Sequence, residues 1–86
     1  MKAITVQALK TMMAQGEDFQ LIDVREKAEY EQFNLQGVSI PLGQLSQEVH
    51  RIERHKKVVI HCKSGARSQK AIQILMREFD FDNLYH

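Results

Sequence analysis

The chain has 86 residues, 43% of them hydrophobic, and a formal net charge of +1 at pH 7. This length suits one compact domain with a modest core over residues 1–86 and leaves no room for two domains. The balanced charge argues against a nucleic-acid binder, and no apolar run is long enough for a signal peptide or a membrane span. A single cysteine cannot form an internal disulfide, so we expect a reducing compartment and a cytoplasmic protein.

Strands and helices alternate from the first residues onward. Residues 2–4 can form a short edge strand, and Thr5 is a good N-cap for the helix that follows. The methionine pair Met12 and Met13 falls on the apolar stripe of this helix and is expected in the core, and Gly16 ends the helix.

The middle of the chain predicts two short strands with a helix between them. Residues 19–24 are an apolar run that ends in a charge, which is typical of a buried parallel strand. Residues 27–33 favour a short helix. Residues 38–40 favour a brief strand, which Pro41 stops because proline cannot donate a ladder hydrogen bond.

The remaining segments continue the alternation. Apolar residues spaced by three and four predict a helix over 42–52, followed by a strand at Lys57–His61. Residues Ala66–Phe79 carry a clear helical stripe, and residues 83–85 form a last strand. The pattern predicts an α/β fold with a parallel sheet, in which ligands bind beyond the carboxyl ends of the strands.

The only cysteine lies just past one such strand end. It opens the run Cys62-Lys63-Ser64-Gly65-Ala66-Arg67-Ser68. The small residues let several backbone N–H groups turn toward one point, and the following helix directs its positive end there. Neighbouring cations would lower the pKa of the thiol further. The run therefore predicts an anion-cradling nucleophile site rather than a cysteine that only fills the core.

This run resembles the active-site loop of single-domain rhodanese-like sulfurtransferases, in which four residues separate a cysteine from an arginine. Residues 21–26, 37–42 and 81–85 resemble further segments of that family and come in the same order. The resemblance extends from residue 4 to residue 85. It implies a rhodanese-like three-layer α/β sandwich, in which helices flank a small parallel sheet.

The resemblance also implies an activity that needs neither a metal nor an organic cofactor. Cys62 would take a sulfane sulfur from a small donor such as thiosulfate, become a persulfide and pass the sulfur to a thiol or to cyanide. The loop residues would bind the substrate: Lys63, Ser64, Gly65, Ala66, Arg67 and Ser68. Partners that fit this role are a small sulfur donor, a thiol acceptor, a sulfur-carrier protein or a fused adenylyltransferase domain.

The loop side chains allow more than one role. Arg67 could bind the anionic end of the donor, or it could hold the loop through carbonyl groups and a nearby carboxylate. Lys63 is the better candidate for steering the substrate. Ser64 and Ser68 could donate to the sulfur anion, but a serine in this position more often caps a helix.

Charged residues near the loop have structural interpretations. Asp23 and Arg25 follow a neighbouring strand, where they can anchor loops through charge-assisted hydrogen bonds. His61 precedes Cys62 on a strand whose side chains alternate between faces, so it is expected to be structural or to face solvent. The basic residues of 51–57 would attract small anions to the cysteine loop, or they are simply a solvated segment.

Two other functions compete with sulfur transfer. Cysteine-dependent phosphatases and arsenate reductases share the His-Cys start and the arginine, but they place five residues between cysteine and arginine, whereas this chain has four. A non-catalytic interaction module on the same fold is the second alternative, although such modules commonly lack the cysteine.

Rhodanese-like domains usually continue past the last strand into a terminal helix, whereas this chain ends at His86. We therefore expect a fold truncated at its C-terminus, either as a fragment of a longer protein or with an open sheet face. An open apolar face would make the chain marginally stable or favour a homodimer.

Overall fold

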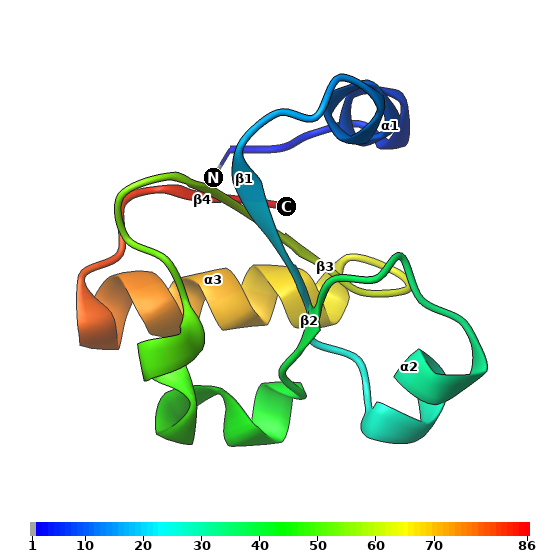
Figure 1. The fold of residues 1–86 in the computed structure, drawn as a ribbon. Helices are drawn as coiled ribbons and strands as arrows, with labels where there is room; N and C mark the ends of the chain where they lie inside the picture. The colour runs from blue at the N-terminus through cyan, green and yellow to red at the C-terminus, as the bar shows by residue number, and fades with distance from the viewer. Residues whose placement is uncertain (1) are drawn as a thin grey trace.

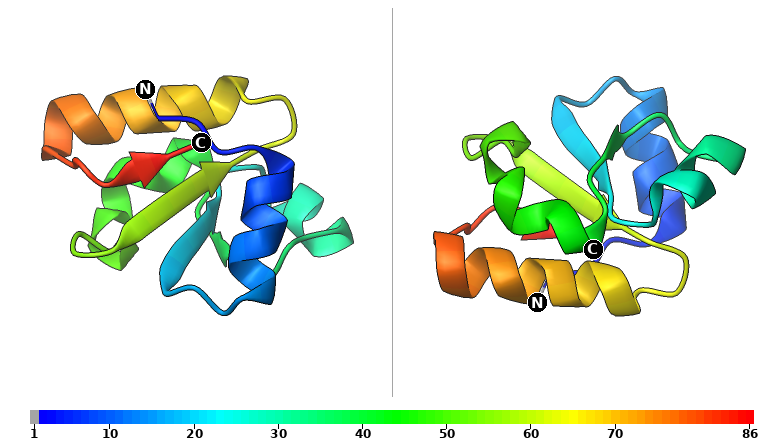
Figure 2. Two further views of the ribbon diagram at one scale, coloured as in Figure 1. Left: turned by 90° about the horizontal axis from the view of Figure 1, so that it is seen from above. Right: turned by 90° about the horizontal axis from the view of Figure 1, so that it is seen from below.

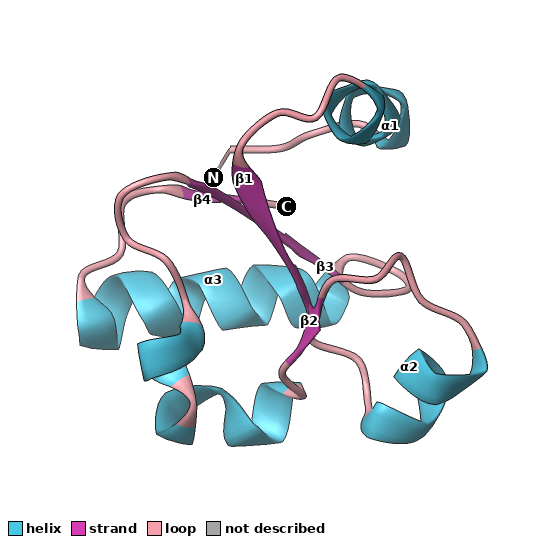
Figure 3. Ribbon diagram, viewed as in Figure 1, coloured by secondary structure: helices cyan, strands magenta, loops and turns pink. Residues whose placement is uncertain are grey.

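The computed structural model describes residues 2–86, which contain a four-stranded parallel sheet in the order β2-β1-β3-β4 (Figures 1 and 3). Its strands are β1 (Phe19–Asp23), β2 (Val38–Ser39), β3 (Lys57–His61) and β4 (Leu84–Tyr85). The two longest strands, β1 and β3, pair along their full length. In this register Asp23 lies directly beside His61 at the carboxyl ends of the strands.

Helices cover both faces of the sheet. Helix α1 (Val6–Ala14) lies on one side, while α3 (Ala66–Phe79) and the 3-10 segments η1 (Leu42–Gln47) and η2 (Val49–Arg51) lie on the other (Figure 2). The short helix α2 (Lys27–Gln32) follows β1 beyond the carboxyl end of that strand. The predicted three-layer α/β fold is confirmed.

The two helix layers enclose separate parts of the core. Ile22 and Ile60 are fully buried on the face covered by α3, whereas Leu21 and Val59 pack with α1 on the opposite face. Successive strand residues point to opposite faces, so two short apolar strands supply both layers. This burial on both sides is expected for a parallel sheet.

Local signals explain where the helices begin and end. The Thr5 hydroxyl accepts a hydrogen bond from the Ala8 N–H at 3.0 Å and caps α1 as predicted. Helix α3 buries Ala71 and Leu75 on one stripe, and it ends where Asp80 adopts a left-handed conformation with φ of 59°.

The predicted helix over residues 42–52 was wrong in type. The segment forms two 3-10 turns that are separated at Glu48, where φ is −113° and ψ is 14°. A 3-10 helix has three residues per turn, so the three-residue spacing of Leu42 and Leu45 fits it as well as an α-helix. Gly43 also weakens the α-helical alternative.

Two expectations near the N-terminus differ from the structure. Met12 is buried, but Met13 is 43% exposed and does not belong to the core. Residues 2–4 do not form a strand of their own, and Lys2 makes only an isolated parallel bridge to Tyr85. The Ile4 N–H also donates to the His86 carbonyl at 2.7 Å, so the two ends of the chain lie side by side.

The sheet face beside α1 is largely covered in the described chain. Val59 at its centre is 2% exposed, and Ile4, Phe19 and Tyr85 pack around it while staying half-buried. The self-association expected from the sequence remains a prediction.

Candidate active site

The loop after β3 wraps around the sulfur of Cys62. The Gly65 N–H donates to Sγ at 3.1 Å and the Ser68 N–H donates at 3.4 Å. Gly65 can direct its N–H inward because it adopts a φ of 91°, in the left-handed region that glycine enters without steric cost. The N-cap residue Gly65 and the first turn of α3, which starts at Ala66, therefore each point one backbone donor at the same sulfur atom.

The same contacts set the acidity of the thiol. Burial alone would raise the pKa of Cys62, but the backbone and side-chain hydrogen bonds of Ser68, with those of the Gly65 and Ser64 backbone, outweigh it and lower the pKa. The thiol lies 3.6 Å from the Ser68 hydroxyl, which itself donates to the Gly65 carbonyl at 2.9 Å. A thiolate is the nucleophilic form of cysteine, so this cradle favours reaction at Cys62.

Arg67 is turned toward helix α2. Its guanidinium makes a two-point ion pair with Glu29, with Nη1 to Oε1 at 2.7 Å and Nη2 to Oε2 at 3.1 Å. The hydrogen bond to Arg67 lowers the pKa of Glu29 to about 2. Of the two roles left open for Arg67, the observed contacts match the one in which it holds the loop through a nearby carboxylate.

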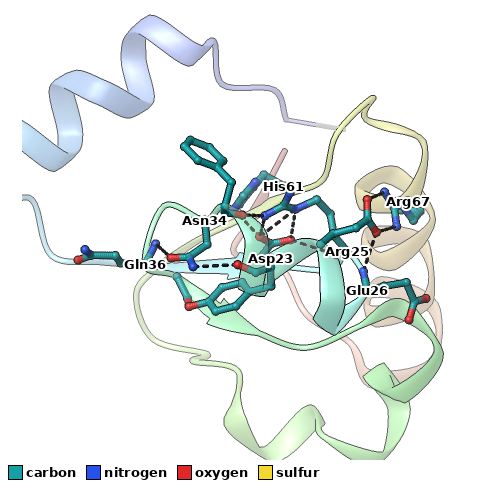
Figure 4. A network of polar contacts seen from close by, with 11 residues as sticks. Asp23, Arg25, Glu26, Asn34, Gln36, His61 and Arg67 are labelled. Atoms are coloured by element: carbon teal, nitrogen blue, oxygen red, sulfur yellow. Dashed lines mark hydrogen bonds and ion pairs between the residues drawn. The ribbon is translucent and has the colours of Figure 1, made fainter.

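Asp23 and Arg25 form a second ion pair at the carboxyl end of β1 (Figure 4). Asp23 is fully buried, and its carboxylate accepts from the Arg25 N–H at 3.0 Å and from the guanidinium at 2.8 to 3.1 Å. Burial would raise the pKa of Asp23, but the hydrogen bonds from Arg25 outweigh it and lower the pKa. Arg25 also donates to the Phe33 carbonyl at 2.6 Å and so ties the end of α2 to the sheet.

A hollow of about 520 Å³ opens in front of the cysteine. Cys62, Lys63 and His61 line it from the β3 side, and Arg25 and Phe33 line it from the α2 side. Lys63 is exposed, and within residues 2–86 it makes no ion pair, whereas Arg25 is paired with Asp23. The hollow thus combines a thiol whose pKa is lowered, a lysine without an ion pair in the described residues, and apolar side chains.

The basic residues of 51–57 do not extend this site. They precede or begin β3, whereas Cys62 follows the end of that strand, so about 16 Å of strand separates them from the thiol. That separation exceeds the screening length of about 8 Å at physiological salt. Lys56 and Lys57 also pair with Asp18 and Glu17. Of the two interpretations left open for this segment, these contacts favour the solvated one.

The family model for the rhodanese-like domain matches residues 5–86 of the chain. The chain belongs to the rhodanese-like domain family. A protein of Allochromatium vinosum named as a sulfurtransferase is 33% identical over 76 residues, which cover 87% of this chain and 71% of that protein. YrkF of Bacillus subtilis, named as a proposed sulfur carrier protein, is 32% identical over 76 residues but is covered to only 41% of its length. This chain therefore spans less than half of YrkF.

Solved structures show the same rhodanese-like fold. A rhodanese-like domain protein of Staphylococcus aureus superposes with a TM-score of 0.86 at 24% identity, over 99% of this chain and 82% of that one. The single-domain sulfurtransferase RDL2 of Saccharomyces cerevisiae gives a TM-score of 0.77 at 21% identity, over 98% and 80% of the two chains. At these sequence identities, the structural similarity shows a shared fold and nothing further.

Sequence reasoning missed Glu29 as a residue that contacts the rhodanese-like loop. It lies 38 residues from Arg67 in sequence, and only the packing of α2 beside the loop brings them together. The sequence feature that could have pointed to Glu29 is an acidic residue at the third position of a helix. There the Glu29 carboxylate also accepts a hydrogen bond from the Glu26 N–H in a capping box.

None of the helices described in residues 2–86 combines the length and the apolar stretch that crossing a bilayer requires. The same residues hold no cluster of three or more histidine, cysteine or acidic side chains arranged to bind a metal ion.

Proposed function

We propose that this member of the rhodanese-like family transfers sulfane sulfur through a persulfide on Cys62. The observation that carries the proposal is the Cys62 sulfur, which accepts two backbone hydrogen bonds at 3.1 and 3.4 Å at the wall of an open hollow. Preorganised N–H groups of this kind stabilise negative charge without reorganising during the reaction. The proposal fits a relative of known name, the Allochromatium sulfurtransferase.

The reaction proceeds in two half-reactions. In the first, the Cys62 thiolate attacks the outer sulfur of thiosulfate, a new S–S bond forms, and sulfite leaves with the electron pair of the broken S–S bond. In the second, an acceptor thiolate attacks the sulfane sulfur, and the Cys62 thiolate leaves. No oxidant or reductant is consumed beyond the donor and the acceptor.

In this proposal the loop residues have different roles. Gly65 and Ser68 direct their N–H groups at the sulfur and hold the charge of the thiolate or the persulfide. Lys63, which lines the hollow without an ion pair in the described chain, attracts the anionic donor. The Ser64 backbone makes the smallest of the contributions that lower the pKa of the thiol, and Ala66 leaves space at the start of α3.

Intact-protein mass spectrometry after thiosulfate treatment tests the proposal. We expect the protein to gain the mass of one sulfur atom, and reduction with a thiol should remove it. The Cys62→Ser variant should gain no mass and form no thiocyanate with cyanide. A Cys62→Ser variant that transfers sulfur like the unaltered protein would refute the proposal.

A second assay separates sulfur transfer from phosphate-ester hydrolysis. A ring closed by four residues between cysteine and arginine is too tight for the three outer oxygens of a phosphate, so we expect no useful hydrolysis of aryl phosphates. A kcat/KM of about 10⁴ M⁻¹s⁻¹, the lower end for ordinary enzymes, would contradict this expectation.

A further inference from the structure

His61 carries a buried nitrogen that has no partner. Among the buried side-chain nitrogen and oxygen atoms of residues 2–86, only Nε2 of His61 and Oδ1 of Asn83 lack a hydrogen bond. Oδ2 of Asp23 lies 3.7 Å from Nε2, which is too long for a hydrogen bond. A buried polar group left without a partner calls for an explanation, and near a reactive group that explanation can be chemical.

The position of the ring relates it to the candidate nucleophile. His61 is the last residue of β3, and Cys62 follows the strand and packs against the same core cluster as Val58 and Ile60. Both residues line the hollow of about 520 Å³, and the His61 side chain keeps 20% of its surface exposed. A molecule that enters this hollow to reach Cys62 therefore also meets His61, which lines the same hollow.

The two ring nitrogens of His61 have different surroundings. Nε2 is buried toward the fully buried carboxylate of Asp23, which favours a proton on that nitrogen. Nδ1 makes no hydrogen bond in residues 2–86 and is not one of the buried unpartnered atoms, so it remains open. A neutral imidazole with its proton on Nε2 leaves Nδ1 free to act as a base, on a residue that lines the hollow.

Charged groups from several elements act on this imidazole. Burial lowers its pKa, the charge of Asp23 on β1 raises it, and the charge of Arg25 lowers it again, with a lower pKa as the net result. Lys63 also lines the large hollow, and His86 lines a smaller hollow of about 160 Å³ next to His61. The imidazole is thus neutral at pH 7, and Asp23 is placed to stabilise the cation that forms when it takes up a proton.

We propose that His61 is the general base that removes the proton from the acceptor thiol in the second half-reaction. The inference rests on the proposed function, because it requires a persulfide on Cys62. The acceptor R–SH gives its proton to Nδ1, and the resulting thiolate attacks the sulfane sulfur. The Cys62–S bond to that sulfur breaks, the products are the acceptor persulfide and the Cys62 thiolate, and the imidazolium returns its proton to solvent.

The test compares an acceptor thiol that must lose a proton with one that is already ionised, and it follows the ratio of their rates from variant to variant. Protein first loaded with thiosulfate, and checked for the added sulfur by mass spectrometry, is mixed with 2-mercaptoethanol or with a nitro-substituted aryl thiol that is already ionised at neutral pH. His61→Gln keeps an amide that can donate to Asp23 but cannot take up a proton. General-base catalysis contributes about 10²- to 10⁴-fold, so the ratio of alkyl-thiol to aryl-thiol rate should fall at least about tenfold in His61→Gln.

The matched control is His50→Gln, which removes a histidine side chain that is 73% exposed and lies outside the site. Its rate ratio should equal that of the unaltered protein. The inference fails if His61→Gln slows both thiols by the same factor or slows neither. Failure of the proposed function looks different, because the protein then gains no sulfur in the loading step.

A measurement on the unaltered protein keeps the inference testable if His61→Gln does not fold. Without a base, the rate with 2-mercaptoethanol must rise about tenfold per pH unit up to the pKa of the thiol, near 8.5 for such groups. With His61 as base, the rate should rise with pH only until the imidazole is neutral. Because the usual pKa of an imidazole is about 6.5, the rate should already have reached its plateau at about pH 7. A tenfold rise per unit that continues through pH 7 would overturn the inference.

Discussion

Arg67 and Glu29 form a two-point ion pair, at 2.7 and 3.1 Å, that joins the Cys62 loop to helix α2. Two nitrogens of the planar guanidinium each bind one oxygen of the carboxylate. This two-point geometry fixes the relative orientation of the two side chains as well as their distance. Arg67 follows Ala66 in the first turn of α3, so the pair also fixes the turn whose N–H groups reach Cys62. The loop that cradles the sulfur is therefore held from outside by α2.

Glu29→Gln should slow the loading of sulfur onto Cys62. The amide still accepts from the Glu26 N–H, so the start of α2 is preserved, but it cannot pair with Arg67 at both nitrogens. A small displacement of a positioned group can cost up to about 100-fold in rate, and we expect a loss of about 10- to 100-fold here. Stopped-flow measurement of loading from thiosulfate gives the rate.

The matched control for this experiment is Glu31→Gln, an exposed acid on the same helix that has no ion pair in residues 2–86. It should load at the rate of the unaltered protein. Because the pKa of Glu29 is lowered to about 2, its contribution is complete above its ordinary value of 4.5 and is lost only as the pH falls toward 2. Equal loading rates for the two variants between pH 5 and 8 would contradict the role given to Glu29.

Ser68→Ala should raise the pKa of Cys62. The side-chain hydrogen bond of Ser68 is one of the contacts that lower this pKa, and alanine removes it while keeping the backbone N–H at 3.4 Å from Sγ. We expect alkylation by iodoacetamide to need a higher pH in the variant and to slow several-fold at pH 7. Ser46→Ala, at an exposed position of η1, is the control. An unchanged alkylation profile in Ser68→Ala would show that the backbone donors alone set the acidity.

The alternation of apolar runs predicted the sheet and its faces, because a strand that is buried on both faces consists of consecutive apolar residues. Residues such as Ile22 and Ile60 occur in short apolar runs that are typical of a parallel strand buried on both faces. The loop was predictable for a similar reason, since the cysteine, the glycine and the following helix are all local features. Glu29 was not, because its contact with Arg67 depends on where α2 packs.

The type of the 42–51 segment also escaped prediction. The spacing of Leu42 and Leu45 suits three and 3.6 residues per turn alike, and only the break at Glu48 decides between them. The basic residues of 51–57 are close to Cys62 in sequence, but an extended strand carries them to the opposite end of the sheet. Residues that are close to Cys62 in sequence are in this case far from its sulfur in space.

Gly65→Ala should destabilise the protein and disturb the sulfur cradle together. An added Cβ at Gly65 would meet no atom within 4 Å, so the cost comes from the φ of 91° alone. A side chain in the left-handed region costs about 1–2 kcal/mol. Gly43→Ala is the matched control, because that glycine is also free of neighbours within 4 Å and its φ is not positive. Urea unfolding should show the loss in Gly65→Ala alone, with slower sulfur loading, and equal midpoints would refute the strain argument.

Asp23→Asn should cause the largest loss of stability among these variants. The buried carboxylate accepts four hydrogen bonds from Arg25, whose side chain is only 14% exposed, and the neutral asparagine leaves that cation without its counter-charge. Removing one partner of a buried ion pair costs about 3 kcal/mol. Asp18→Asn, which removes an acid that is 85% exposed, should change the unfolding free energy little. Equal urea midpoints for the two variants would contradict the role of Asp23 as an anchor.

The same carboxylate gives a pH dependence with a defined sign. The folded-state pKa of Asp23 lies below its ordinary value of 3.8, so the protein gains stability above that pH and loses it as the pH falls through the lowered pKa. The unfolding free energy of the unaltered protein should therefore drop between pH 5 and pH 2. In Asp23→Asn the group that titrates is absent, and the drop should be smaller by the contribution of Asp23. Parallel pH profiles in urea for the two proteins would show that Asp23 is not ionised against Arg25 in the folded state, and the anchor would then have to act through packing alone.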